Sequence, residues 1–161
     1  QRQMCIRDRF RDRRLIQFLQ RPTEYTHAVF STALDPNVFV LRLVPGMRAD
    51  IIPMLEGRYR ALVLESFGVG GLPGGDDGAM FAAVRDWCGA GHLAVFTTQV
   101  PHEGSDLAVY EVGRAAKALP GVLEAHDMTP EATAVKLMWV LGQTTDRAEA
   151  EKLFLLSLIH I

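Results

Sequence analysis

This sequence has few cysteines, no long apolar run and no large excess of charge of either sign. Its two cysteines, Cys5 and Cys88, lie far apart and outside any Cys-x-x-Cys or Cys/His cluster. We therefore expect neither a disulfide framework nor a metal site, and a reducing compartment such as the cytoplasm fits best. No apolar run approaches the roughly 20 residues that span a bilayer. A net charge of −2 leaves no basic footprint for nucleic acid, so no membrane or nucleic-acid partner is expected.

What the sequence does have is the apolar content of a globular domain. Of its 161 residues, 48% are hydrophobic and 22% are charged, which is enough for one domain with a substantial core. The two ends differ from the rest, because residues 1–9 (QRQMCIRDR) and 156–161 (LSLIHI) resemble translated sequencing adaptors. We predict that both ends are foreign to the natural protein, which would then be cut at both ends.

Strand-like and helix-like segments alternate through the middle of the chain. β-branched and aliphatic runs predict strands, and apolar residues three or four positions apart predict helices. The predicted strands are 38–43, 61–64, 93–96 and 122–125, and the predicted helices are 50–56, 80–88, 109–119 and one that begins at 130. Strands separated by helices normally pair in parallel through right-handed crossovers. We therefore predict an α/β fold, with a mostly parallel sheet of about four strands and helices on both faces, as in Rossmann-like and flavodoxin-like domains.

Two helix starts are predicted from capping residues. Thr129 would cap the last helix, with Pro130 at the first helical position, where its missing N–H costs nothing. Asp76 or Asp77 would cap the second helix, in which Cys88 would be buried. The core-facing stripe of the last helix is predicted to be Ala134, Leu137, Met138 and Leu141.

Two unusual loops follow the second and third predicted strands, where parallel sheets gather their ligands. The first, SFGVGGLPGG (66–75), contains five glycines, and the second, TTQVPHEGSD (97–106), is polar. A phosphate site in the first loop is disfavoured, because Pro73 replaces the third glycine of the dinucleotide fingerprint and Asp76–Asp77 replace the Lys and Ser/Thr of a P-loop. A tight turn that needs unusual backbone angles is the alternative.

Four motifs occur in order between about Asp35 and Leu153. They are LRLVPGM, LVLESFGVGGLP, the set FTTQV, EGSD and VYEVG, and EAHDMTPEATAVKLMWVLGQT. Together they resemble the carboxyl-terminal domain of the L-asparaginases, closest to the cytoplasmic type I branch. The resemblance implies such a domain at 35–155, preceded at 10–34 by a linker or the tail of an amino-terminal domain. It also implies an amidohydrolase that converts L-asparagine to L-aspartate and ammonia, as a homodimer or homotetramer without metal or organic cofactor.

The resemblance further implies that the catalytic threonine is not in this chain. Family members attack the amide carbon with a threonine hydroxyl of the amino-terminal domain, supported by a second Thr–Asp pair and a Lys, and no segment here matches those motifs. We therefore predict no catalytic residue in this chain and no activity of the chain by itself. Its role would be to supply interface loops to an active site shared between subunits.

The same resemblance points to the two loops as substrate- or effector-binding elements. The glycine loop at Gly68, Val69, Gly70 and Gly71 would let the backbone approach a partner subunit closely. Relatives activated by asparagine have arginine and cysteine at the positions of Glu65 and Val100, so this activation is predicted to be absent; a carboxylate would repel the effector carboxylate. The binding candidates are Glu65, Ser66, Thr98, Gln99, Val100, Glu103, Asp106 and Tyr110.

Other interpretations of these residues stay open. A turn and a helix cap at Ser105 or Asp106 would explain the second loop equally well. Two further functions also remain. One is the amidohydrolase subunit of a tRNA-dependent amidotransferase, which works with a tRNA-binding partner, and the other is a noncatalytic α/β module that binds a small amino acid.

Overall fold

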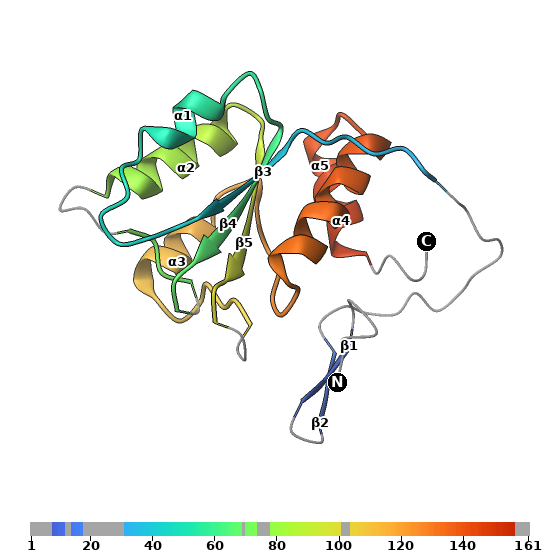
Figure 1. Ribbon diagram of the computed structural model, residues 1–161, viewed down its shortest axis with the longest axis horizontal. Coiled ribbons are helices and arrows are strands. Elements are labelled where there is room, and N and C mark those ends of the chain that lie inside the picture. The colour runs from blue at the N-terminus through green and yellow to red at the C-terminus, as the bar shows by residue number, and fades with distance from the viewer. Residues whose placement is uncertain are drawn as a thin grey trace.

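A four-stranded parallel sheet forms the centre of the domain (Figure 1). This computed structural model describes residues 8–11, 14–17, 31–68, 70–73, 78–100 and 104–156. The strands of the sheet lie side by side in chain order and are β3 (Val38–Arg42), β4 (Ala61–Ser66), β5 (Leu93–Thr98) and β6 (Val122–Glu124). All three pairings are parallel, so the predicted α/β fold with four parallel strands is confirmed.

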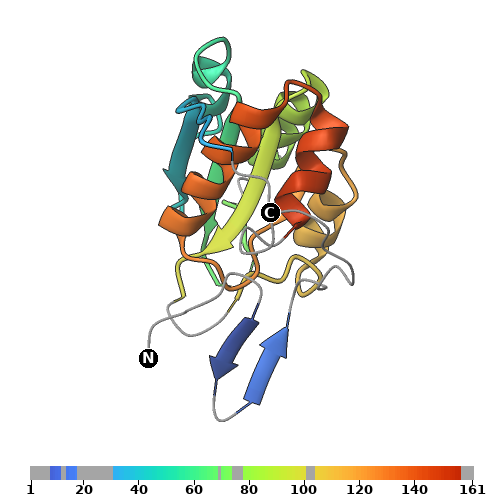
Figure 2. The same cartoon turned by 90° about the vertical axis from the view of Figure 1, so that its right-hand side faces the viewer.

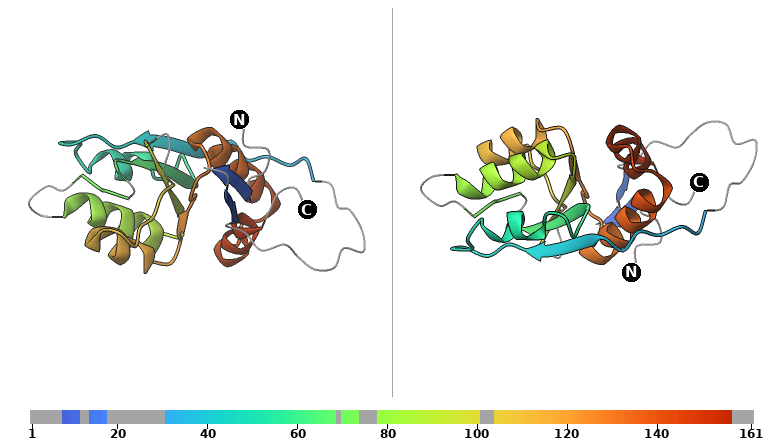
Figure 3. Two further views of the ribbon diagram at one scale, coloured as in Figure 1. Left: turned by 90° about the horizontal axis from the view of Figure 1, so that it is seen from below. Right: turned by 90° about the horizontal axis from the view of Figure 1, so that it is seen from above.

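Helices cover both faces of this sheet, as predicted. The elements on one face are α1 (Ile51–Leu55), α2 (Ala79–Gly89) and α3 (Glu111–Lys117), and those on the other are α4 (Pro130–Gln143) and α5 (Arg147–Leu155). Figure 2 shows α4 and α5 in front of the sheet, and the end-on views in Figure 3 show the two helical layers on either side of it. Two features were not predicted from the sequence. One is the separate helix α5, and the other is an antiparallel pair formed by β1 (Asp8–Arg11) and β2 (Arg14–Gln17).

The two central strands explain why their sequences are almost continuously apolar. Side chains of a strand alternate between the faces of its sheet, and here each face carries helices. Leu62 and Leu64 of β4 lie in the core beneath α1, α2 and α3, whereas Ala61 and Val63 lie in the core beneath α4 and α5. Both faces of β4 and β5 are therefore buried, so these strands lack the alternation of polar and apolar residues that a solvent-facing side would produce.

The helix starts confirm one capping prediction and correct the other. Thr129 Oγ1 accepts a hydrogen bond from Ala132 N at 3.2 Å, and Pro130 begins α4. At α2 the N-cap is Gly78, with φ 65° and no side-chain cap, so the predicted aspartate cap is wrong. Asp76 and Asp77 themselves lie outside the described residues. Glycine adopts a positive φ without steric strain, which lets the chain enter α2 directly from the loop.

Helix α4 carries the predicted apolar stripe and one buried cation. Ala134, Leu137 and Leu141 are buried, with Met138 partly buried beside them. Lys136 is also fully buried. Its Nζ donates to the carbonyl of Leu156 at 2.8 Å and lies 4.9 Å from the centre of the Phe154 ring. Helical periodicity did not predict this lysine, because it describes where apolar residues fall and says nothing of a charged residue among them.

Candidate functional site

Most of the predicted site residues meet at the carboxyl edge of the sheet. Because β4 and β5 are parallel and in register, their last residues, Ser66 and Thr98, lie opposite each other. The chain continues from β5 into Gln99, whose backbone N–H donates to the carbonyl of Ser66 at 3.0 Å. The structure therefore brings Glu65, Ser66, Thr98, Gln99 and Val100 together, as the order of the strands requires.

The Gln99 side chain ties three strand ends together. Its Nε2 donates to the carbonyls of Leu43 at 2.6 Å and Glu65 at 2.8 Å. Its Oε1 accepts from Nε of Arg42 at 3.2 Å. Both amide donors and the amide oxygen are thus used within the protein. A ligand that bound Gln99 would have to replace these bonds, since an amide left unpaired at a partly buried site costs free energy.

Arg42 is a residue of this edge that sequence reasoning missed. It is the register partner of Glu65 on the neighbouring strand, so the two side chains leave the same face of the sheet. Among the described residues, neither forms an ion pair with the other or with any third group. The edge therefore presents a cation and an anion on adjacent strands. The signal was present in the sequence, because Arg42 interrupts the apolar run of the first predicted strand.

The hydroxyl groups of Ser66, Thr97 and Thr98 donate to backbone carbonyls. Ser66 is fully buried, and its Oγ donates to Thr97 O at 2.8 Å. Thr97 Oγ1 donates to Met128 O at 3.2 Å, and Thr98 Oγ1 donates to Gly68 O at 2.5 Å. Thr98 Oγ1 also accepts from Val100 N at 3.0 Å. These contacts hold the two loops against β4 and β5 without needing a ligand.

The glycine loop folds tightly against its own chain. Gly71 N donates to Phe67 O at 2.9 Å, and a Cβ at Gly71 would lie 2.8 Å from that oxygen. A Cβ at Gly70 would lie 3.1 Å from Asp106 O in the second loop. The missing side chains therefore permit a close approach of two segments within the chain. The predicted approach to a partner subunit at Gly68 to Gly71 stays a prediction, and Val69 lies outside the described residues.

The second loop is described at 97–100 and again from Gly104, where it packs beside the first loop. Glu103 lies outside the described residues. Asp106 is exposed, and its Oδ1 accepts from Ala108 N at 2.9 Å, a local contact that fits the predicted turn. The Tyr110 hydroxyl lies 3.5 Å from where a Cβ of Gly68 would be, and 49% of Tyr110 is exposed. The backbone of Asp106 and the ring of Tyr110 thus lie beside the glycine loop, and their predicted role in binding stays a prediction.

Several kinds of site have no candidate in the described part of the chain. No group of three or more His, Cys, Asp or Glu side chains there could hold a metal ion. None of the helices described is long and apolar enough to cross a membrane. Cys88 is buried, as predicted, and burial raises the pKa of its thiol to about 11, so this side chain is a poor nucleophile near neutral pH.

A groove elsewhere on the domain lies away from these residues. It has a volume of about 360 Å³ and runs between α1 and α2, where Ile52, Pro53 and Trp87 contribute to its lining. None of the predicted site residues lines it. The chemistry suggested by the sequence and the groove therefore belong to different parts of the surface.

Comparison with known proteins identifies a family and several relatives of this chain. The model of the glutaminase/asparaginase C-terminal domain family matches residues 37–154. An L-asparaginase of Thermococcus kodakarensis is 41% identical over 125 residues, covering 78% of this chain and 37% of the relative. One subunit of the glutamyl-tRNA(Gln) amidotransferase of Metallosphaera sedula is 35% identical over 126 residues, covering 78% of this chain and 28% of the relative. This chain thus spans about a third of the length of these relatives.

A solved structure shows the same fold. The thermostable L-asparaginase from Thermococcus kodakarensis superimposes with a TM-score of 0.72 and 34% sequence identity. The superposition covers 92% of this chain and 44% of that structure.

Proposed function

Because the chain belongs to the glutaminase/asparaginase C-terminal domain family, we propose that it is the carboxyl-terminal domain of an L-asparaginase, an amidohydrolase that converts L-asparagine to L-aspartate and ammonia. The observation that carries this proposal is the 41% identity to a protein named L-asparaginase over 125 residues. The four motifs of the sequence fall within the matched region. The motif LVLESFGVGGLP and the set that begins with FTTQV include the two loops at the carboxyl edge of the sheet.

The bonding of the hydroxyl groups at the carboxyl edge indicates that the nucleophile of the hydrolysis lies outside this chain. A serine or threonine attacks an amide only when a neighbouring base takes its proton. The hydroxyl groups of Ser66, Thr97 and Thr98 donate hydrogen bonds to backbone carbonyls, which cannot take up a proton at neutral pH. The chain by itself is therefore expected to release no ammonia from asparagine, and the reaction would need the larger part of the relatives that this chain does not span.

The contribution of this domain would be made by the two loops. Glu65, Glu103 and Asp106 offer carboxylates for the ammonium group of asparagine, and Tyr110 offers a half-exposed hydroxyl beside the glycine loop. The loop at Gly68, Val69, Gly70 and Gly71 would meet a second subunit, so the complete protein would be a homodimer or homotetramer. We propose that it works in the cytoplasm without metal or organic cofactor.

Activation by a second asparagine is proposed to be absent. Glu65 stands where activated relatives carry an arginine, and Val100 stands where they carry a cysteine. The Gln99 amide is engaged by Leu43, Glu65 and Arg42, so it offers no free donor to an effector. A site that does not favour the effector in one of two states cannot shift their equilibrium. Rates measured against asparagine concentration should then be hyperbolic.

A second candidate rests on the 35% identity to the amidotransferase relative. That protein matches the same part of this chain, and the loops described above do not separate the two functions. The difference would lie in the partner that receives the ammonia.

Two chimeric proteins test the proposal. In one, residues 31–156 follow the upstream part of the Thermococcus kodakarensis L-asparaginase; in the other, they follow the upstream part of the Metallosphaera sedula amidotransferase relative. Ammonia release from asparagine and glutamine is measured for both, with each upstream part alone as the control. Activity with asparagine in the first chimera only is the expected result. Activity in the second only would favour the amidotransferase, and two folded but inactive chimeras would favour a noncatalytic amino-acid-binding module.

A further inference from the structure

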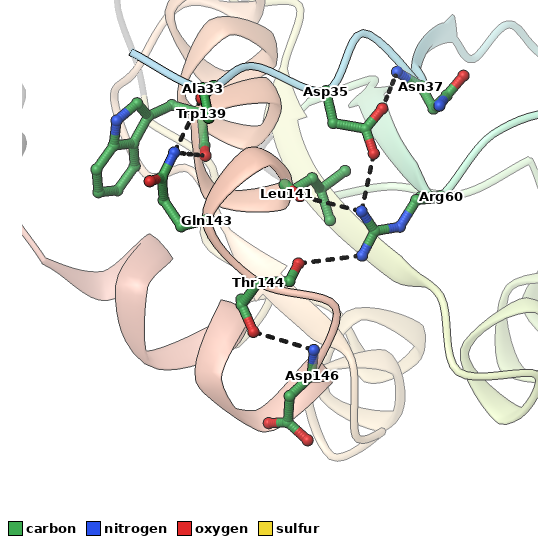
Figure 4. A network of polar contacts seen from close by, with 9 residues as sticks. All are labelled: Ala33, Asp35, Asn37, Arg60, Trp139, Leu141, Gln143, Thr144 and Asp146. Carbon is green, nitrogen blue, oxygen red and sulfur yellow. Dashed lines mark hydrogen bonds and ion pairs between the residues drawn. The ribbon is translucent and has the colours of Figure 1, made fainter. Parts of the chain in front are cut away.

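Residues 31–37, which we call the strap, run along the outside of α4 before the chain enters β3 (Figure 4). Asp35 N donates to Met138 O at 2.8 Å. The indole Nε1 of Trp139 donates to Ser31 O at 3.1 Å, and Nε2 of Gln143 donates to Ala33 O at 2.9 Å. The strap is therefore bonded to the second half of one helix through Ser31, Ala33 and Asp35. At its other end the carbonyl of Asn37 accepts from Arg60 N at 2.8 Å, beside the start of β4.

Polar contacts hold the strap, and apolar burial contributes little. Neither hydrophobic core includes a residue of the strap. Its largest apolar side chain, Leu34, is 60% exposed. Segments with few buried apolar contacts open locally at a lower free energy than the core of the domain. By this criterion the strap belongs to the part of the domain that opens at low free energy.

One ion pair joins the strap to the body of the domain. Arg60 Nη1 lies 2.8 Å from Asp35 Oδ2. The same guanidinium donates to Leu141 O at 3.0 Å and to Thr144 O at 3.1 Å, so it also binds the carboxyl-terminal end of α4 (Figure 4). Arg60 directly precedes β4 and is bonded to the end of α4, whereas Asp35 belongs to the strap.

We propose that the strap opens from α4 and closes on it as a local unit, and that the ion pair between Asp35 and Arg60 is its latch. A closed latch fixes the point at which the preceding residues join the domain, beside the carboxyl-terminal half of α4. An open latch releases that point while both cores stay packed. This inference concerns the fold and holds whichever activity the complete protein has.

The variant Asp35→Asn tests the latch with little other change. It removes the negative charge that pairs with Arg60 but keeps an Oδ1 acceptor for Asn37 N, a bond of 2.9 Å in the present structure. Arg60 keeps its two carbonyl partners on α4. The matched control is Asp50→Asn, which removes an exposed ion pair with Arg48 on the opposite face of the sheet.

The two tryptophans give separate readings of the strap and the core. The Trp139 indole N–H is bonded to the strap, whereas the Trp87 indole N–H donates to Leu93 O at 2.9 Å inside the other core. Hydrogen exchange of both indoles is followed by NMR in the full chain. In Asp35→Asn we expect the Trp139 indole to exchange about tenfold faster, since a hydrogen bond to a charged group is lost, with Trp87 unchanged.

The remaining outcomes overturn the proposal. An unchanged Trp139 rate in Asp35→Asn would show that the ion pair does not hold the strap. An equal acceleration of both indoles would show that the strap opens only when the whole domain unfolds. A Trp139 rate that rises as much in Asp50→Asn would trace the effect to lost surface charge in general.

Discussion

Replacing Lys136 by methionine should remove a pH dependence of stability that the buried ammonium group creates. Lys136 is fully buried, and its contacts are the carbonyl of Leu156 at 2.8 Å and the ring of Phe154. Burial disfavours the charged form of an amine, and it lowers the pKa of Lys136 from 10.5 to about 8. Methionine matches the length and flexibility of the side chain without its charge.

The size and sign of the effect follow from that pKa. Below pH 8 both the folded and the unfolded chain hold the proton, and the folded state bears the whole cost of the buried charge. Between pH 8 and 10.5 the folded state has released a proton that the unfolded state still binds, so the free energy of unfolding rises with pH. A difference of two to three pKa units corresponds to about 3 kcal/mol over the whole range.

Cys88 acts in the opposite direction and has to be removed from the measurement. Burial raises the pKa of its thiol from 9.0 to about 11, with Arg147 lowering it and Glu151 raising it in smaller measure. The unfolded chain therefore loses this proton first, and stability falls between pH 9 and 11. The two effects overlap above pH 9, so the comparison is made in a Cys88→Ala background.

Urea unfolding between pH 7.5 and 10 measures the effect. Stopping at pH 10 avoids Lys117, whose pKa is raised above 10.5 by its hydrogen bond to Glu124. The free energy of unfolding of Cys88→Ala should rise by about 2 kcal/mol over this range. The double variant with Lys136→Met should show no such rise. The same rise in both proteins would refute the reasoning, as would a flat profile in Cys88→Ala alone.

Three further outcomes are expected. Gly71→Ala should destabilise the domain by about 1–3 kcal/mol in urea unfolding, because its Cβ would lie 2.8 Å from Phe67 O. Gly89→Ala should not destabilise it, because no atom lies within 4 Å of the added Cβ. Equal effects of the two variants would contradict this packing argument. Partial burial acts to raise the pKa of Asp35, but hydrogen bonds from Asn37 and Arg60 lower it overall. The strap should therefore stay closed above about pH 4 and open as the pH falls through that lowered pKa. A ratio of Trp139 to Trp87 indole exchange that stays constant with pH would count against this. Val109, Tyr110 and Val112 lie within four residues of the chain and are each about half exposed, so they should contribute to the binding of a hydrophobic dye, and Val112→Ser should weaken that binding.

Local patterns predicted the framework of the domain correctly. The central strands β4 and β5 were visible as apolar runs because both of their faces are buried. Thr129–Pro130 marked the start of α4 because a cap and a first-turn proline act within a few residues. The capping prediction for α2 was wrong. Helix-capping preferences favour an aspartate just before a helix, but here Gly78, with its positive φ, is the N-cap residue.

The candidate site was predicted as a place but not as a set of bonds. Parallel topology brings the ends of β4 and β5 together, so Glu65, Ser66, Thr98 and Gln99 could be grouped from the order of the strands alone. The burial of Ser66 and the engagement of Gln99 by Leu43 could not, because these depend on side-chain direction and on a third strand. Glu103 lies outside the described residues, and its role stays a prediction.

The sequence by itself determined the order and type of the central elements, since periodicity and capping are properties of neighbouring residues. Tertiary structure alone decided which polar groups meet. Gln99 bonds to Leu43 across 56 positions, and Arg60 bonds to Thr144 across 84. Such contacts form only after the sheet has placed distant segments side by side, and each polar group then takes the partner that burial leaves within reach. For this reason the latch of the strap and the buried Lys136 became visible only in the folded chain.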